Sequence, residues 1–83
     1  IHYYKCDLTD EKSSLETFEN IKKDFPEISY WFNNAGVARL GKFLEVSQDD
    51  FNLVMKVNFD TQVIATRFWL SYFEQKGKGT IIN

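Results

Sequence analysis

Two short runs of residues have types suited to hydrogen bonding and to close backbone approach. Asp7 and Leu8 place a side-chain carboxylate beside a backbone N–H. An adenine edge carries an amine that donates and a ring nitrogen that accepts, so this pair has the complementary groups. In the run 33–36 (Asn-Asn-Ala-Gly), the small alanine and glycine let a bound ribose approach the backbone. Asp7 has a second interpretation, as a residue that only caps a turn.

Asn58 is a polar residue in an apolar stretch. It lies between Val57 and Phe59, in a segment with helical spacing. An amide disfavours a helix there and requires a hydrogen-bond partner. A buried asparagine is most often a satisfied structural residue. The residue type alone therefore leaves a structural and a chemical role open.

The elements that must position these residues begin with a strand and a helix. Residues 1–6 are rich in β-branched and aromatic side chains and predict a strand that ends at Asp7. Thr9 or Asp10 is expected to cap a helix whose apolar stripe reaches Phe25, and Pro26 closes that helix. The apolar run 28–32 predicts a second strand, buried on both faces.

A long helix is predicted over residues 48–76. Ser47 and Asp50 have the pattern of a capping box, in which each side chain binds the other's free backbone N–H. Helical spacing continues for roughly seven turns at 3.6 residues per turn. Gly77 and Gly79 are expected to end the helix in the left-handed conformation. Residues 80–83 begin a third strand.

The order strand, helix, strand, helix, strand predicts an α/β protein of Rossmann type. That fold is a doubly wound parallel sheet in a three-layer α/β/α arrangement, of which this chain supplies part. Binding sites lie at the carboxyl ends of such strands, where Asp7 and the run 33–36 are expected.

Four landmarks resemble those of the short-chain dehydrogenase/reductase family. Residues 7–9 (Asp-Leu-Thr) are similar to its Asp-hydrophobic-Ser/Thr segment, and residues 33–36 to its Asn-Asn-Ala-Gly motif. Val57-Asn58 is similar to its helix asparagine, and residues 79–83 to the strand that leads into its catalytic serine. By chance, an Asn-Asn-Ala-Gly string occurs in about one chain in a thousand of this length. Four landmarks in the family's order therefore favour membership.

The resemblance implies an oxidoreductase that moves a hydride between NAD or NADP and a carbonyl or alcohol of a small-molecule substrate. It implies that Asn58 is catalytic and holds a water on the proton relay, partly through its backbone carbonyl. It also implies that Asn34 ties neighbouring strand ends together. The residues expected to bind the cofactor are Asp7, Leu8, Asn33, Ala35, Gly36 and Val57.

The resemblance further implies that residues 1–83 are the central part of a single NAD(P)-binding domain. The family's glycine-rich phosphate loop is expected before Ile1, and its catalytic serine, tyrosine and lysine after Asn83. The residue that distinguishes NAD from NADP is also expected upstream, and the 83 residues alone are expected to be inactive. Two alternatives remain open: a family member that binds a dinucleotide without catalysis, and another kind of α/β protein in which the run 33–36 is only a turn.

The composition limits the kinds of partner that this chain is expected to bind. A formal net charge of −2 provides no broad basic field for nucleic acid or an anionic membrane. No apolar run approaches the roughly 20 residues needed to cross a bilayer. Cys6 is the only cysteine and His2 the only histidine, so no metal site is expected and a reducing, cytoplasmic setting is favoured. The resemblance also implies a homo-oligomer, a dimer or tetramer formed through the helix 48–76.

Overall fold

The computed structural model describes all 83 residues and contains two helical units and two strands. Helix α1 (Glu11–Asp24) precedes strand β1 (Tyr30–Phe32), and a short 3₁₀ turn, η1 (Phe43–Glu45), lies in the loop that follows. Strand β2 (Thr80–Ile82) comes last. Between the turn and β2 runs a helical rod made of α2 (Gln48–Met55), the π-helical segment η2 (Lys56–Asp60) and α3 (Thr61–Lys76). Both predicted helices and the last two predicted strands are confirmed.

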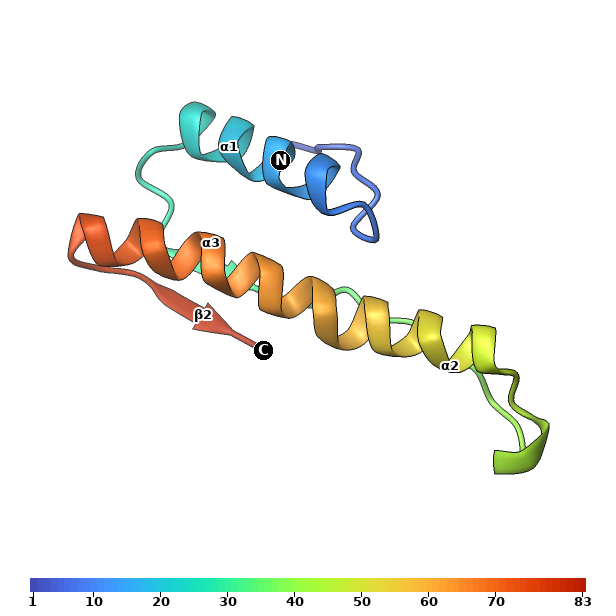
Figure 1. Cartoon of the computed structure of the whole chain (residues 1–83). Helices are drawn as coiled ribbons and strands as arrows, with labels where there is room; N and C mark the ends of the chain where they lie inside the picture. Colours follow the sequence, from blue (N-terminus) through green and yellow to red (C-terminus); the bar gives the residue numbers. More distant parts are fainter.

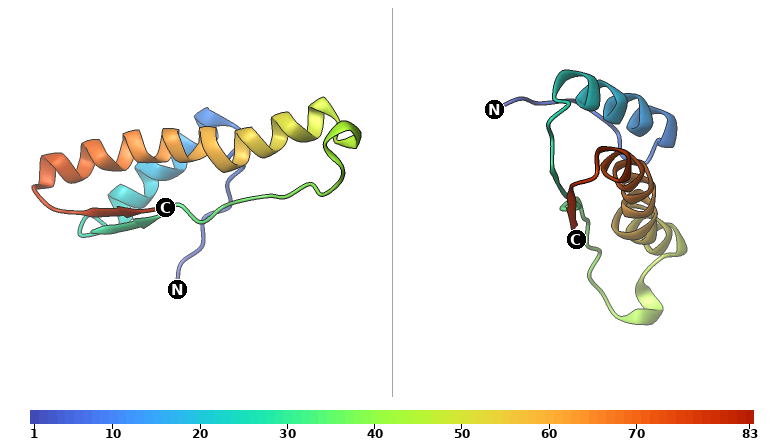
Figure 2. Two further views of the ribbon diagram at one scale, coloured as in Figure 1. Left: turned by 90° about the horizontal axis from the view of Figure 1, so that it is seen from below. Right: turned by 90° about the vertical axis from the view of Figure 1, so that its left-hand side faces the viewer.

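β1 and β2 form a parallel pair in which Tyr30 lies opposite Thr80 and Phe32 opposite Ile82. Figure 1 shows α1 lying alongside α3, and the two views of Figure 2 place both helices on the same side of the strands. Trp31 packs against the helices, whereas Tyr30 and Phe32 are each 62% exposed. The expectation that this strand is buried on both faces is wrong here, because both helices cover one face.

The core lies between α1, α3 and the strands. Its buried hydrophobic residues are Phe18, Ala65, Trp69 and Phe73. Trp69 stacks on Trp31, with ring centroids 4.7 Å apart, and Phe18 meets Trp31 edge-on at 5.2 Å. Aromatic pairs of this kind contribute about 0.5–1.5 kcal/mol beyond the burial of their area. The cluster thus fixes β1, which leads into Asn33, against both helices.

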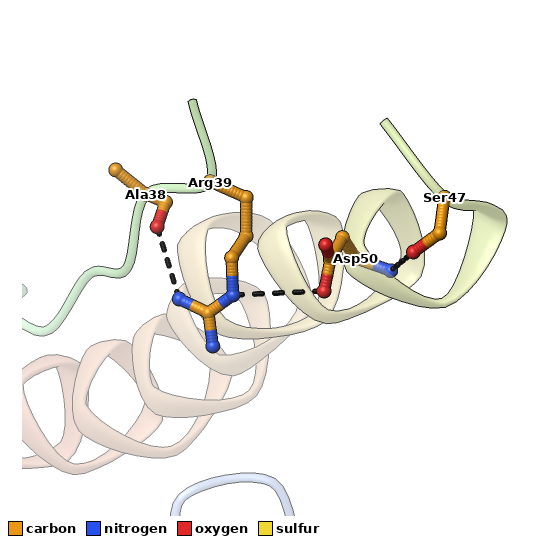
Figure 3. A network of polar contacts seen from close by, with 4 residues as sticks. All are labelled: Ala38, Arg39, Ser47 and Asp50. Carbon is orange, nitrogen blue, oxygen red and sulfur yellow. Dashed lines mark hydrogen bonds and ion pairs between the residues drawn. The ribbon is translucent and has the colours of Figure 1, made fainter. Parts of the chain in front are cut away.

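Side-chain caps set where the helices begin. Asp10 Oδ1 accepts from Ser13 N at 3.4 Å, and Ser47 Oγ accepts from Asp50 N at 3.0 Å, so both expected caps are confirmed. The other half of the capping box does not form. Figure 3 shows the reason: the Asp50 carboxylate faces Arg39, whose Nε lies 3.6 Å from Asp50 Oδ1. This ion pair connects the loop after β1 to the start of α2.

Two glycines shape the turn from α3 into β2. Gly77 has a φ of +81°, the left-handed conformation expected at the end of the helix. Gly79 does not share that conformation, since its φ is +151°. A Cβ built on Gly79 would overlap the ring of buried Phe73. Gly79 therefore allows the chain to pass directly against the core as β2 begins.

Residues 1–6 do not form the predicted strand, and they lie along α1 instead. The rings of His2 and Phe25 have centroids 4.8 Å apart. The Tyr4 hydroxyl donates to Asp24 Oδ2 at 2.7 Å, and this bond raises the pKa of Tyr4. A strand needs a hydrogen-bonded neighbour, and the sheet contains only β1 and β2. The prediction failed because the strands that would flank this segment in a doubly wound sheet are not among its neighbours.

None of the helices combines the length and the apolar character required to cross a bilayer. No group of three or more histidine, cysteine, aspartate or glutamate side chains is arranged to hold a metal ion.

Candidate functional site

The turn at Asp7 offers hydrogen-bonding groups that the chain itself does not use. Asp7 Oδ1 accepts from Thr9 Oγ1 at 2.7 Å and from Thr9 N at 2.9 Å, and the hydroxyl bond and then the backbone bond lower the pKa of the Asp7 carboxyl. Oδ2 accepts no hydrogen bond, and the Leu8 N–H donates none. The turn-capping role of Asp7 is therefore confirmed. A free acceptor and a free donor remain on adjacent residues.

Asn33 joins three elements at the carboxyl end of β1. Its Nδ2 donates to Asn83 Oδ1 at 2.8 Å, just beyond β2, and to Thr66 Oγ1 on α3 at 3.2 Å. Its Oδ1 accepts from Trp31 Nε1 at 2.9 Å. Asn34 is exposed and its side chain makes no hydrogen bond. The expectation that Asn34 ties the strand ends together is wrong, because the alternation of side chains along the strand turns Asn33 toward the helices with Trp31.

Asn58 binds the backbone of the loop that follows Gly36. Its Oδ1 accepts from Val37 N at 2.8 Å, and its Nδ2 donates to Val37 O at 2.8 Å. The amide thus pairs with Val37 as a neighbouring strand would. A Cβ built on Gly36 would lie 3.3 Å from Asn58 Oδ1, so glycine allows this close approach. Both polar atoms of the Asn58 side chain are thus engaged with the backbone of Val37.

Asn58 and Val57 lie in the π-helical segment η2, not in a regular α-helix. The Thr61 N–H donates to Lys56 O, five residues back. The Val57 carbonyl, which a regular α-helix would pair with that N–H, accepts from Thr61 Oγ1 at 2.5 Å. The predicted helix 48–76 therefore has the expected extent but a different hydrogen-bond pattern at its candidate catalytic residue. Single π turns within α-helices occur frequently at functional sites.

A small cavity of about 50 Å³ lies between Leu8 and the run 33–35. Leu8, Asn33, Asn34 and Ala35 line it, and Thr61 contributes from α3. Ala35 and Gly36 are exposed, so their backbone is accessible from outside. The structure thus places Leu8 next to the run 33–35, and Asn58 binds the backbone of Val37, the residue after Gly36.

Sequence patterns did not identify the partners that hold these residues, which are Trp31, Val37, Thr66 and Asn83. Val37 contributes only its backbone, which no residue pattern identifies. The contact between Trp31 and Asn33 could have been predicted, since residues two apart in a strand point to the same face. For Asn58, the signal was its need for a partner in an apolar helix, although the identity of that partner depends on the fold.

Comparison with known proteins identifies dehydrogenases among the relatives of this chain. The family model for short chain dehydrogenases matches residues 1–83. The chain is 36% identical over 81 residues to the NADP-dependent 3-hydroxy acid dehydrogenase of Schizosaccharomyces pombe. It is 33% identical over 64 residues to the 2-dehydro-3-deoxy-D-gluconate 5-dehydrogenase of Pseudoalteromonas atlantica. These matches cover 95% and 77% of this chain but 31% and 25% of the relatives.

Solved structures agree with the sequence comparison. ElxO with NADP bound superposes with a TM-score of 0.90 at 28% identity, covering 98% of this chain and 33% of ElxO. NAD⁺-bound xylitol dehydrogenase gives a TM-score of 0.87 at 26% identity, covering 94% of this chain and 30% of that enzyme. The predicted Rossmann-type α/β class is thereby confirmed, and the chain spans about a third of these proteins. The chain belongs to the short-chain dehydrogenase family.

Proposed function

We propose that the protein containing this chain transfers a hydride between NAD or NADP and a carbonyl or alcohol of a small-molecule substrate. Residues 1–83 then form the central part of its single dinucleotide-binding domain. Support comes from the family, from a relative named as NADP-dependent, and from similar structures that hold NADP or NAD⁺. The observation that carries the proposal is the pair of unused groups on adjacent residues, the Asp7 Oδ2 acceptor and the Leu8 N–H donor, of which Leu8 lines the cavity at the end of β1.

Asp7 and Leu8 have the groups that an adenine edge requires. The exocyclic amine of adenine would donate to Asp7 Oδ2, and the Leu8 N–H would donate to a ring nitrogen. The bonds from Thr9 lower the pKa of Asp7, so the carboxyl stays ionised and remains an acceptor at neutral pH. The same bonds hold the carboxylate in one orientation, which reduces the entropy lost when a ligand binds.

The run 33–36 would accommodate the adjoining ribose. Exposed Ala35 and Gly36 carry little or no side chain, and this permits close approach to their backbone. Asn33 sits at the strand end next to them and lines the same cavity as Leu8. We assign Val57 to the same site by its place in the motif, beside Asn58.

Asn58 would contribute in two ways. Its side chain fixes Val37, and with it the loop that leaves the cofactor site. Its main-chain carbonyl, in the π-helical segment, would hold a water through which a proton passes to or from the substrate oxygen. The bound nicotinamide supplies the hydride, and the chain supplies orientation and proton transfer.

The test measures binding of NADH and NADPH to the full-length protein by calorimetry, followed by turnover with a panel of carbonyls and alcohols. Asp7→Ala is expected to weaken binding about tenfold or more, because a hydrogen bond to a charged group contributes about 1.5–3 kcal/mol. Asp49→Ala, which alters an acidic residue in the first turn of α2, serves as the matched control and should bind normally. Absence of binding to either dinucleotide would refute the proposal. Tight binding without any turnover would favour the non-catalytic module.

We also propose that the rod 48–76 forms a homo-oligomeric contact. Phe51, Phe59 and Leu70 are 53%, 58% and 55% exposed on it, and exposed apolar side chains of this size favour association. Leu70→Glu should lower the molar mass measured by light scattering without changing the circular dichroism of the helices. A wild-type protein that is already monomeric would contradict this contact.

We propose a cytoplasmic location for the protein. The support is the free thiol of Cys6, which is the only cysteine of the chain, since reduced thiols persist in a reducing compartment. Fractionation of cells that produce the tagged full-length protein tests this location. Recovery of the tag in an oxidising compartment would refute it.

A further inference from the structure

We propose that Trp31 is a positioning residue for Asn33, and through Asn33 for the carboxyl ends of β1 and β2. This role rests on the proposed function, because Asn33 is one of the residues assigned to the cofactor site. The Trp31 Nε1–H donates to Asn33 Oδ1 at 2.9 Å in a partly buried setting. The indole therefore contacts a residue of the site, and it also lines the cavity at the end of β1.

The indole determines which way the Asn33 amide faces. An asparagine amide can rotate by half a turn and exchange its oxygen and nitrogen with little change of shape. The other two partners do not prevent that rotation, because the Thr66 hydroxyl and the Asn83 amide can each present a donor or an acceptor. An indole N–H only donates. Trp31 thus requires Asn33 Oδ1 on its side and directs Nδ2 toward Thr66 and Asn83.

Trp31 is itself held by the core. Its ring stacks on Trp69 with an interplanar angle of 24° and meets Phe18 edge-on at 77°. Turning the indole away from Asn33 would disrupt both contacts. The orientation of the amide is therefore tied to the best-packed part of the chain.

Asn33 transmits this constraint to both strand ends. Its main-chain N–H donates to Ile82 O at 2.8 Å, and its Nδ2 donates to Asn83 Oδ1, also at 2.8 Å. Ala35 follows two residues later and lines the cavity shared with Leu8. If the amide turned over, the Trp31 N–H would face the Asn33 nitrogen and lose its acceptor, and Asn83 would have to turn its own amide to keep the side-chain bond between the strand ends.

The test compares two tryptophan substitutions in the full-length protein. Trp31→Phe removes the hydrogen bond but keeps an aromatic ring. Trp69→Phe is the matched control, because the Trp69 N–H is buried without a partner and its loss breaks no hydrogen bond. Trp31→Phe is expected to weaken binding of the reduced dinucleotide about threefold to tenfold, the effect of one net hydrogen bond. Trp69→Phe should change binding less than about twofold, even if it lowers the melting temperature as much or more.

A double variant separates positioning from general packing. In an Asn33→Ala background there is no amide to orient, so adding Trp31→Phe should leave dinucleotide affinity unchanged. The proposal is overturned if Trp31→Phe weakens binding no more than Trp69→Phe does. It is also overturned if the loss persists in the Asn33→Ala background.

Hydrogen exchange of the Trp31 indole proton distinguishes this proposal from the proposed function. Asn33→Ala should accelerate that exchange about tenfold, because it removes the acceptor. Asn34→Ala, the matched control beside it, should not. If the wild-type protein binds neither dinucleotide, the proposed function fails. The exchange rate of the Trp31 indole proton then tests the orientation of Asn33 by Trp31 independently, and equal rates in Asn33→Ala and Asn34→Ala would overturn it.

Discussion

Asn58→Ala is predicted to release the loop after Gly36 from the rod. The substitution removes two hydrogen bonds of 2.8 Å, each with a net contribution of about 0.5–1.5 kcal/mol. Alanine raises the free energy of unfolding by up to about 0.7 kcal/mol, because it favours the helix more than asparagine does. Val37 is half-buried, so water replaces only part of what is lost. The expected decrease in the free energy of unfolding is therefore about 1–2 kcal/mol.

Urea denaturation of the full-length protein measures this decrease, and hydrogen exchange of the Val37 amide locates it. The matched control is Asn52→Ala on α2, an exposed asparagine whose side chain accepts a single bond from Gln48 Nε2. It gains the same helix preference, so it should stay within about 0.5 kcal/mol of wild type. Accelerated exchange at Val37 should appear only in Asn58→Ala.

Asn58→Asp sharpens the test, since it keeps the acceptor for Val37 N but sets a carboxylate against Val37 O. It should be less stable than Asn58→Ala at neutral pH, and it should recover below about pH 4, where the protonated acid can donate. The reasoning is refuted if Asn58→Ala unfolds at the same urea concentration as Asn52→Ala and the Val37 amide remains as protected as in wild type.

Three further predictions concern the turns and the chain as a whole. Gly79→Ala should lower the free energy of unfolding by about 1–3 kcal/mol or more, because its Cβ would overlap the Phe73 ring. In thermal melting, Gly79→Ala should lower the melting temperature more than Gly77→Ala does. The Cβ of Gly77→Ala lies in open space, so that variant is destabilised only by the left-handed φ. Thr9→Val should raise the lowered pKa of Asp7 toward its ordinary value, and carbon NMR of the carboxyl measures this change. The stabilisation that the variant loses is present above about pH 4 and vanishes as the pH falls through the folded-state pKa of Asp7. The free energies of unfolding of wild type and variant should therefore converge in acid. The isolated 83 residues should melt without a cooperative transition, because only four hydrophobic residues are buried, and a sharp transition shifted by a dinucleotide would contradict this.

Local chemistry made much of the fold predictable. Asp10 and Ser47 cap their helices through their own neighbours, and Gly77 ends α3 because only a few backbone conformations can follow a helix. These features depend on residues three or four apart, which the sequence displays directly. The spacing of apolar residues likewise set the extent of the rod. The strand predicted at residues 1–6 failed because a strand depends on distant partners.

The π-helical segment was not predictable from spacing, because the helical spacing of the sequence continues through residues 56–60 without interruption. Its structural sign is a pair of bonds at Thr61, whose N–H reaches Lys56 while its hydroxyl binds Val57 O. A threonine four residues after a helix carbonyl often makes that second bond in regular helices as well. The residue type was therefore visible, but its effect on the register of the helix was not.

The tie between the strand ends, which Asn33 makes in place of Asn34, shows which kind of inference fails and why. The motif places both asparagines at the strand end, and either amide has the groups to bridge two strands. The deciding fact is which face of the strand each residue occupies, and β1 settles it by turning Trp31 inward to stack on Trp69. Asn33, two residues later, must point the same way and meets Thr66 and Asn83. The packing of one large side chain thus determines which of two identical amides ties the strands and which is left exposed.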